Sequence, residues 1–217
     1  MDKYVILQDN AYEKIRAMVL SNQFLPNTTY SQTKLAAEMG ISRTPVNSAL
    51  QKLAVEGLLD IKPSKGFSLH VLTTEDVVIT YQMRCAVEGY CAMSLSRDLQ
   101  NGVGMPAFQA LQNLLEHQQI VNKTDEDPEV LAALDMEFHA KLVDYAGNML
   151  LSTLFHNQVF RVQALAKSSF KVMNRRYAAV NEHSQILNAI GQKDPYRAYE
   201  AVQNHMDMLK DTMINMM

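Results

Sequence analysis

The sequence lacks long apolar stretches, has few cysteines and does not open like a secreted protein. No stretch reaches the ~18 apolar residues that a membrane-spanning helix needs. The first ten residues, MDKYVILQDN, lack the charged start and apolar centre of a signal peptide. Cys85 and Cys91 lie six residues apart on one predicted helix, on different faces, so a bridge between them is not expected. We therefore expect a cytoplasmic protein with reduced thiols and no membrane contact.

The charge of the chain is unevenly distributed. Hydrophobic residues make up 47% of 217 residues, which suffices for the core of one large or two small domains. Residues 1–72 carry eight Lys and Arg against six Asp and Glu, a balance of +2, whereas residues 73–217 carry twelve against seventeen, a balance of −5. A small basic module joined to a larger acidic body is typical of a DNA-binding protein, although the bias is modest.

Two short helices joined by a tight turn are predicted near the start of the chain, after a first helix over Asn10–Ser21. The second helix covers Gln32–Met39, and Gly40 can end it in the left-handed conformation. Ser42 is a good N-cap for the third helix, which ends near Gly57. This pattern predicts a helix-turn-helix.

A β-hairpin is predicted directly after the third helix. Leu58–Ile61 and Phe67–Val71 have strand composition, and the residues PSKG between them are typical of a turn. A hairpin that follows a helix-turn-helix forms a winged helix, so we expect a DNA-binding domain over residues 1–72.

The third helix begins with polar side chains where a recognition helix contacts bases. Arg43 can bind guanine through two hydrogen bonds, and Asn47, one turn later, can bind adenine. Short hydroxyl groups suit phosphate contacts, and the wing tip can approach the backbone or the minor groove. The alternative is that these are solvated polar residues of an ordinary helix pair. The predicted contacts in this region are Ser42, Arg43, Thr44, Asn47, Lys65 and Gly66.

The segment ISRTPVNSALQKLAVEGLLDIKPSKGF resembles the winged helix of the GntR superfamily, whose pattern is close to VSRTPVREAL..L..EGL....P..G. Asn47 departs from this pattern, because the family usually has Arg there. Gln32 replaces the usual acidic residue, and Thr33 stands where Arg is common. The resemblance implies DNA contacts at Thr33 and Lys34 as well, with fewer phosphate contacts or a different half-site than in typical relatives.

The rest of the chain shows no strand pattern and is predicted to be a helical bundle over residues 73–217. The fold class is therefore mostly α: an N-terminal winged helix-turn-helix with a small β-hairpin, followed by an all-α bundle. Its six predicted helices are Thr74–Ser96, Met105–Val121, Pro128–Tyr145, Asn148–Ser169, Arg176–Ile190 and Asp194–Met217.

Four polar residues lie on or beside apolar faces of the predicted bundle: Asp135, His139, His183 and His205. Asp135 and His139 are one helical turn apart and share a face that points into the core. Three imidazoles and one carboxylate would form a good site for Zn²⁺, Ni²⁺ or Mn²⁺, with open positions for water or a carboxylate. The alternative is a set of hydrogen-bonded core histidines, and the spacing alone does not choose between them.

Two segments resemble the FCD ligand domain of the FadR-type branch of GntR regulators. LDMEFHAKLVDYAGNMLL is similar to the pattern D..FH..L....GN..L, and NEHSQILNAIGQKDPYRAYEAVQNHM to EH..I..AI...D...A......H. The resemblance implies a divalent metal on the four residues and an effector-binding, dimerising domain. It also implies effector contacts at Arg84 and Asn148. Arg84 can instead pair with Glu88 within its helix, and Asn148 can cap the next helix.

These motifs predict a transcription regulator rather than an enzyme, and we expect a repressor. It would bind a pseudo-palindromic operator as a homodimer, and a small carboxylate effector on the metal would shift the dimer between two arrangements. One alternative makes the metal itself the signal. Another, a metal-dependent hydrolase, would need metal-activated water, and neither an HExxH motif nor a His-Asp doublet supports it.

Overall fold

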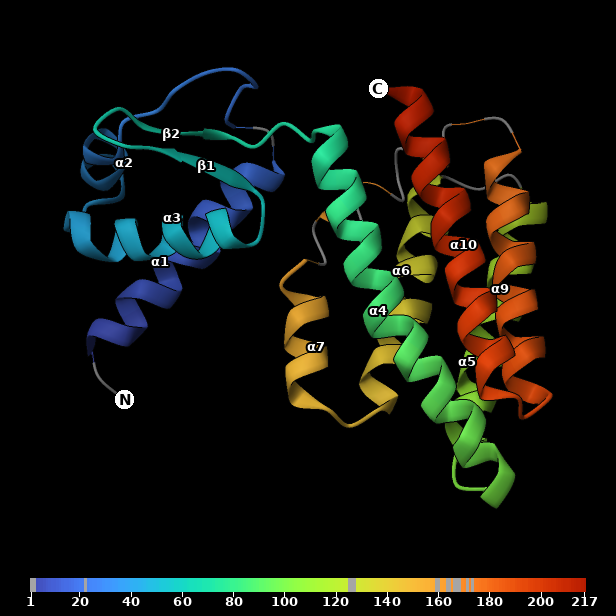
Figure 1. The fold of residues 1–217 in the computed structure, drawn as a ribbon. Helices are drawn as coiled ribbons and strands as arrows, with labels where there is room; N and C mark the ends of the chain where they lie inside the picture. The colour runs from blue at the N-terminus through green and yellow to red at the C-terminus, as the bar shows by residue number, and fades with distance from the viewer. Residues whose placement is uncertain are drawn as a thin grey trace. The chain divides into compact units, whose positions relative to one another are not determined.

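The computed structural model divides into two compact units, residues 1–72 and 73–217 (Figure 1). As predicted, the fold is mostly helical with one β-hairpin. No helix among the described residues is long and apolar enough to cross a membrane. The structure describes residues 3–21, 23–124, 128–158, 161–162, 165, 169–170, 172 and 174–217.

The first unit is a winged helix-turn-helix, which confirms the prediction. Its elements are α1 (Lys3–Leu20), α2 (Gln32–Met39), α3 (Arg43–Val55), β1 (Leu59–Lys62) and β2 (Gly66–Leu69). The first helix starts seven residues earlier than the predicted Asn10. Helices α1 and α3 pack against each other, and their buried aliphatic side chains form the core of this unit (Figure 1).

Local signals fix the turn between α2 and α3. The Ser31 side chain caps α2 by accepting from the backbone N–H of Lys34. Gly40 ends α2 with φ of +68°, the left-handed conformation that favours glycine. Ser42 occupies the predicted N-cap position of α3, but its side chain makes no capping hydrogen bond. Its hydroxyl is therefore not used in capping at the start of α3.

The wing is anchored to the body of its unit through Tyr30. Strands β1 and β2 pair antiparallel, with Leu59 opposite Leu69 and Lys62 opposite Gly66. The backbone of Tyr30 forms a further bridge with Phe67, whose N–H and carbonyl both bond to it. The Phe67 ring is fully buried against the rings of Tyr30 and Phe24. These contacts hold the wing tip in place beside α2.

The second unit is a helical bundle in which α4 packs against α5, α6, α7, α9 and α10 (Figure 1). Thr73 starts α4 with a capping box to Asp76, and Asp194 caps α10. The described elements are α4 (Thr74–Asp98), a short 3₁₀ helix (Leu99–Asn101), α5 (Met105–Lys123), α6 (Pro128–Tyr145), α7 (Met149–His156), α9 (Arg175–Gly191) and α10 (Pro195–Met216).

The predicted helix Asn148–Ser169 is not continuous. Asn148 caps α7, which ends already at His156, and the chain turns at residues 157–158. Residues 161–162, 165 and 169 of the predicted span are again helical, and its other residues after Gln158 lie outside the described part of the chain. The cysteines behave as expected: both are free, with Cys91 buried and Cys85 half-buried. Burial raises the pKa of both thiols, which keeps them protonated at neutral pH.

Candidate metal centre and DNA-reading surface

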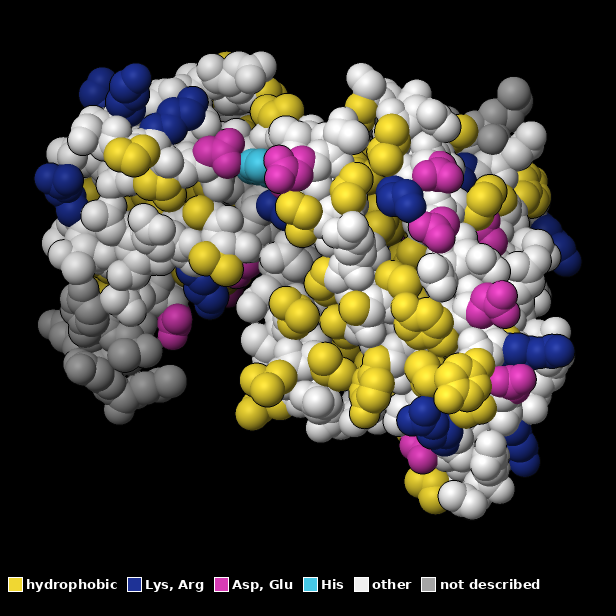
Figure 2. All heavy atoms as spheres, in the orientation of Figure 1, with side chains coloured by type: hydrophobic (Ala, Val, Ile, Leu, Met, Phe, Trp, Pro, Cys, Tyr) yellow, Lys and Arg dark blue, Asp and Glu magenta, His cyan; other side chains and the backbone are white. Residues whose placement is uncertain are grey.

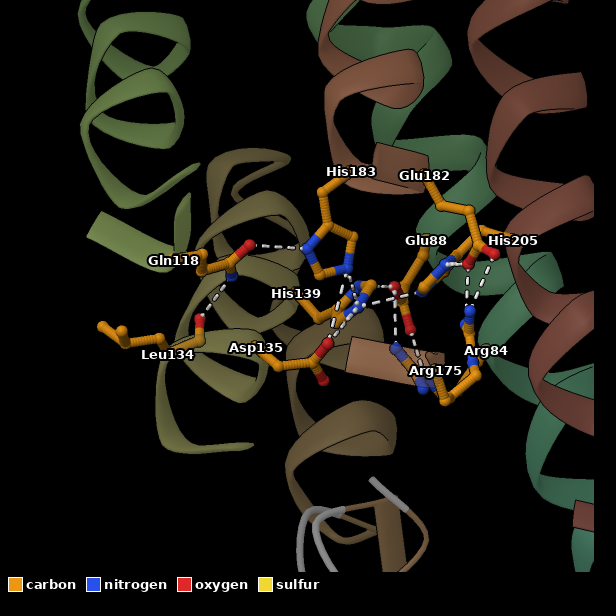
Figure 3. A network of polar contacts seen from close by, with 10 residues as sticks. All are labelled: Arg84, Glu88, Gln118, Leu134, Asp135, His139, Arg175, Glu182, His183 and His205. Carbon is orange, nitrogen blue, oxygen red and sulfur yellow. Dashed lines mark hydrogen bonds and ion pairs between the residues drawn. The ribbon is translucent and has the colours of Figure 1, made fainter. Parts of the chain in front are cut away.

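Three buried histidines converge from α6, α9 and α10 (Figure 3). His139 Nε2 lies 3.1 Å from His183 Nε2 and 3.3 Å from His205 Nε2. One ring nitrogen from each histidine lies within 4.8 Å of the others. Asp135 Oδ1 lies 3.5 Å from His183 Nε2 and 3.9 Å from His139 Nε2. The structure therefore brings together all four residues that the sequence analysis singled out as metal ligands.

The protonation state of His183 follows from its neighbour Gln118. Gln118 Nε2 donates to the carbonyl oxygen of Leu134 at 3.0 Å, so Gln118 Oε1 is the atom that faces His183 Nδ1, at 2.8 Å. Because an amide oxygen only accepts, His183 must carry its proton on Nδ1. The lone pair of His183 Nε2 therefore points at the other two histidines.

His205 is held in the same tautomer by a carboxylate. Its Nδ1 lies 2.6 Å from Glu182 Oε2. Arg175 donates two hydrogen bonds of 2.8 and 2.7 Å to the same carboxylate. Burial raises the pKa of Glu182, but the hydrogen bonds from His205 and Arg175 outweigh it, and the net pKa is lowered. Glu182 is thus ionised, and it fixes the Nδ1 proton of His205.

The Arg84–Glu88 ion pair lies behind His139. The sequence analysis gave this pair as the alternative role of Arg84. Glu88 Oε2 lies 2.5 Å from His139 Nδ1, and Arg84 Nε donates to Glu88 Oε1 at 2.6 Å. All three side chains are buried. Arg84 and Glu88 thus form a buried ion pair on the Nδ1 side of His139, and His139 Nδ1 itself has no hydrogen-bond partner among the described residues. The Nε2 atoms of His183 and His205 both face His139 Nε2.

This arrangement fits a metal ion. The lone pairs of His183 Nε2 and His205 Nε2 both point at His139 Nε2, so a cation at the centre would be within reach of all three imidazoles. Nitrogen ligands at about 2.1 Å from one ion lie about 3.0–3.4 Å apart, which matches the spacing of His139 Nε2 to the other two. The carboxylates and the amide behind the rings are the outer partners that metal-binding histidines commonly have.

Burial of the cluster favours neutral side chains. Burial, followed by the charge of Arg84, lowers the pKa of His139 well below its usual value. Burial likewise lowers the pKa of His183 and, against the opposing contact with Glu182, that of His205. Burial raises the pKa of Asp135 to about 7. A divalent cation would restore the ionised form of this carboxylate, as a ligand requires.

The residues behind the histidines were largely missed by the sequence analysis. Gln118 lies on α5 with no spacing relationship to His183, 65 residues away. Arg175 lies outside the motifs on which the sequence analysis relied. Glu182 offered a signal, because it directly precedes His183 in the motif EH. The other predicted effector contact, Asn148, is exposed and caps α7 through bonds from the N–H groups of Leu150 and Leu151. Its contact with an effector stays a prediction.

Gln118 provides a direct test of this outer layer. We expect Gln118→Leu to weaken metal binding about 10–100-fold, because His183 loses the acceptor that fixes its tautomer. Titration against a chelator of known affinity measures this change. Gln119→Leu, an exposed neighbour on the same helix, is the matched control and should leave the affinity unchanged. Equal affinities in the two variants would contradict the tautomer assignment.

In the first unit, the start of α3 and the wing tip surround a hollow of about 210 Å³. Four predicted contacts line it: Thr33, Arg43, Lys65 and Gly66. Lys62 and Ser64 also line it and were not predicted, although the turn sequence IKPSKGF contains both. The predicted contacts Lys34, Ser42 and Thr44 are also exposed, and each is next in sequence to Thr33 or Arg43. A hollow with Arg and two Lys suits a phosphate group.

Asn47 and Gly66 are less exposed than expected for residues that contact DNA. Asn47 is only half-exposed, and its Oδ1 is buried with no hydrogen-bond partner in the described part of the chain. Gly66 is buried at φ of +127°, and a Cβ atom there would overlap the carbonyl oxygen of Tyr30. Glycine is therefore required at this position by the backbone itself. DNA contacts at both residues stay predictions.

Two family models match the chain. Residues 7–69 match the family described as bacterial regulatory proteins, gntR family, and residues 79–208 match the FCD domain. The chain belongs to the GntR family. It is thus a DNA-binding transcriptional regulator with an FCD domain, and not an enzyme, so the hydrolase alternative is set aside.

Relatives of this GntR-family regulator are regulators as well. It is 26% identical over 196 residues to the uncharacterized HTH-type transcriptional regulator YdhC of Bacillus subtilis, covering 90% of this chain and 86% of the relative. It is 23% identical over 206 residues to the HTH-type transcriptional repressor RspR of Escherichia coli, covering 93% and 86%. A solved structure described as E. coli McbR/YncC shares the fold, with a TM-score of 0.68, 16% identity and 97% and 98% coverage.

Proposed function

We propose that this GntR-family regulator is a repressor that binds operator DNA as a homodimer and releases it in response to a small carboxylate. The effector would bind at a divalent transition metal (Zn²⁺, Ni²⁺ or Mn²⁺) held by Asp135, His139, His183 and His205. The observation that carries this proposal is the convergence of the three buried Nε2 atoms from three different helices. The operator partner implies a cytoplasmic location.

The charge balance around the cluster explains why the ligand would be an anion. With a divalent cation bound and Asp135 ionised as its ligand, the formal charges are −3 for Glu88, Asp135 and Glu182, +2 for Arg84 and Arg175 and +2 for the ion, a sum of +1. A buried excess charge is costly, so the metal-bound site favours an added carboxylate.

Two buried arginines beside the cluster would contact that carboxylate. Arg84 uses Nε and Nη2 on Glu88, so its contact with an effector would need Nη1 or a displacement of Glu88. Arg175 spends both terminal nitrogens on Glu182, while its Nε is buried with no hydrogen-bond partner among the described residues. Arg175 is therefore a further effector contact in this proposal, and its position at the start of α9 links it to His183 on the same helix.

The DNA-reading part is tested with two substitutions in the first unit. We expect Arg43→Ala to lose about 1–3 kcal/mol of operator binding and to relax preference at one base pair, because Arg reads guanine edges. Lys65→Ala should weaken binding to all sequences and reduce the salt dependence by about one counterion. Fluorescence anisotropy on operator and scrambled DNA over a salt series separates the two. An unchanged salt slope for Lys65→Ala would contradict a phosphate contact.

The regulatory part is tested by operator binding in three states of the protein: metal-loaded, chelator-treated, and metal-loaded with malonate. Malonamide, which has the same shape without charge, is the matched control. We expect malonate, and not malonamide, to lower operator affinity, and operator DNA to lower malonate affinity by the same factor. Release by chelator alone, with no effect of malonate, would instead make the metal the signal. Equal malonate affinity with and without operator would rule out the coupling.

A further inference from the structure

A groove lies between α5 and α9 in the helical unit and has a volume of about 560 Å³. This volume is within the range of about 300–1,000 Å³ that small-molecule sites occupy. Gln118 faces His183 while Phe108 faces Gly191, so the two helices run antiparallel along the groove. None of the four candidate metal ligands lines it. We call it the α5–α9 groove, and it is a second candidate site, separate from the metal centre.

The α5–α9 groove has an apolar base and polar walls. Leu115 and Leu187 are buried at its base, and the half-exposed ring of Phe108 also lines it. A Cβ atom on Gly191 would lie 3.1 Å from this ring, so the glycine leaves room for the ring beside α9. The walls carry amide and hydroxyl groups, among them those of Gln112 on α5 and of Ser184 and Asn188 on α9.

These polar side chains have no partners in the described part of the chain. Glu116 carries the only formal charge among the residues that line the groove, and the structure gives its carboxylate neither an ion pair nor a hydrogen bond there. The side chains of Gln112, Ser184 and Asn188 are likewise without a hydrogen bond among the described residues. On the face drawn in Figure 2, by contrast, Lys and Arg side chains of the helical unit lie close to Asp and Glu side chains.

The donors and acceptors of the groove restrict the class of ligand. A carboxylate only accepts hydrogen bonds, whereas an amide or a hydroxyl group both donates and accepts. An anionic ligand would be repelled by Glu116, and no Lys or Arg lines the groove to offset this repulsion. An ammonium ligand only donates, so it would leave the N–H groups of the amides unpaired. Neighbouring hydroxyl groups can donate to the carboxylate and also exchange hydrogen bonds with the amides.

We propose that the α5–α9 groove binds an uncharged polyhydroxylated ligand, a free monosaccharide. Two neighbouring hydroxyl groups of the sugar donate to Glu116, and further hydroxyl groups bind Gln112 and Asn188 on the two walls. The C–H groups of the sugar ring lie against Phe108, since the face of an aromatic ring carries partial negative charge and attracts them. The ligand class differs from the carboxylate proposed for the metal centre, so the two sites do not compete.

Titration of the metal-loaded full chain with D-glucose, D-galactose, D-mannose and D-ribose tests the groove directly. We expect at least one of these sugars to bind with a dissociation constant of about 1–10 mM, because a small ligand in an open groove gains few contacts. The side-chain amide signals of Gln112 and Asn188 in heteronuclear NMR should shift as it binds. Tetrahydropyran, the same kind of ring without hydroxyl groups, is the matched control ligand and should leave both signals unchanged.

Two substitutions identify the contacts. Glu116→Gln should weaken sugar binding about tenfold, because a hydrogen bond to an ionised acceptor is roughly twice as strong as one to a neutral acceptor. Glu137→Gln, at an exposed position on α6, removes the same charge elsewhere and should leave the affinity unchanged. Phe108→Leu keeps an apolar side chain but removes the flat ring, and should weaken binding about threefold or more.

Chelator and malonate separate this groove from the metal centre. Sugar binding should persist in the chelator-treated protein and in the presence of malonate, because no lining residue is a candidate metal ligand. A sugar that malonate displaces would lie at the metal and would overturn the proposal. Failure of all four sugars to shift the two amide signals would overturn it too, as would equal affinities in Glu116→Gln and Glu137→Gln. Operator binding and metal binding are measured separately, so the proposed function does not depend on these results.

Discussion

His139→Ala is expected to abolish metal binding by the purified regulator. His139 Nε2 is the atom that lies close to both other histidines, at 3.1 and 3.3 Å, so its loss opens the centre of the site. Metal at about 1,000 times its dissociation constant contributes about 4 kcal/mol to folding stability. For a chain of this size that corresponds to roughly 10 °C in the unfolding temperature of the metal-bearing unit. Elemental analysis and calorimetry, with and without chelator, measure both effects.

The surface histidine of α7 is the matched control. His156 is 45% exposed and pairs with Asp144 at 3.0 Å, away from the buried triad. His156→Ala should keep one metal per chain and its chelator-sensitive stability. In His139→Ala, chelator should have no further effect on the unfolding temperature. A His139→Ala protein that retains one equivalent of metal with unchanged affinity would show that the three imidazoles form a hydrogen-bonded core, the alternative that spacing left open.

The sequence predicted elements whose signals are local. Gly40 and the spacing of apolar residues predicted the turn of the DNA-binding motif, and the polar run between two strand-like segments predicted the wing. The end of α7 was missed because Asn157 and Gln158, where the chain turns, are neither glycine nor proline and the surrounding residues favour a helix. Helix ends set by tertiary packing leave little trace in the local sequence.

In the metal centre too, some contacts follow from local helix geometry and others arise only from the tertiary fold. Asp135 and His139 share one helical turn, so their proximity follows from helix geometry. The apolar faces that carry His183 and His205 made their convergence one of two alternatives, and the family resemblance favoured it, because no local rule relates three different helices. Gln118 carried neither signal, yet it determines the tautomer of His183. Residues that hydrogen-bond the metal-site histidines from behind are therefore identified only from the structure. Any amide or carboxylate that lies close enough to a histidine can make this hydrogen bond, whatever its place in the sequence.

Gly66→Ala is expected to disrupt the wing without touching the metal centre. At φ of +127°, an L-residue is strained, and the new Cβ would overlap the Tyr30 carbonyl oxygen that accepts the Phe67 N–H. Strain and lost backbone pairing together should cost about 3 kcal/mol or more. Hydrogen exchange at β2 should rise sharply in the full chain, and operator affinity should fall with it. Metal content should remain at the wild-type value.

Gly40→Ala separates this steric requirement from the general cost of replacing a left-handed glycine. Gly40 has φ of +68° with no atom within 4 Å of an added Cβ, so its replacement should cost only about 1–2 kcal/mol. If Gly66→Ala has no larger effect than Gly40→Ala on hydrogen exchange, the overlap with Tyr30 is relieved by a small backbone shift. If β2 stays protected in Gly66→Ala while operator binding is lost, the glycine acts by letting the phosphate backbone approach the wing. Only a joint loss of protection and binding makes Gly66 a structural requirement of the wing that carries Lys65, the proposed phosphate contact.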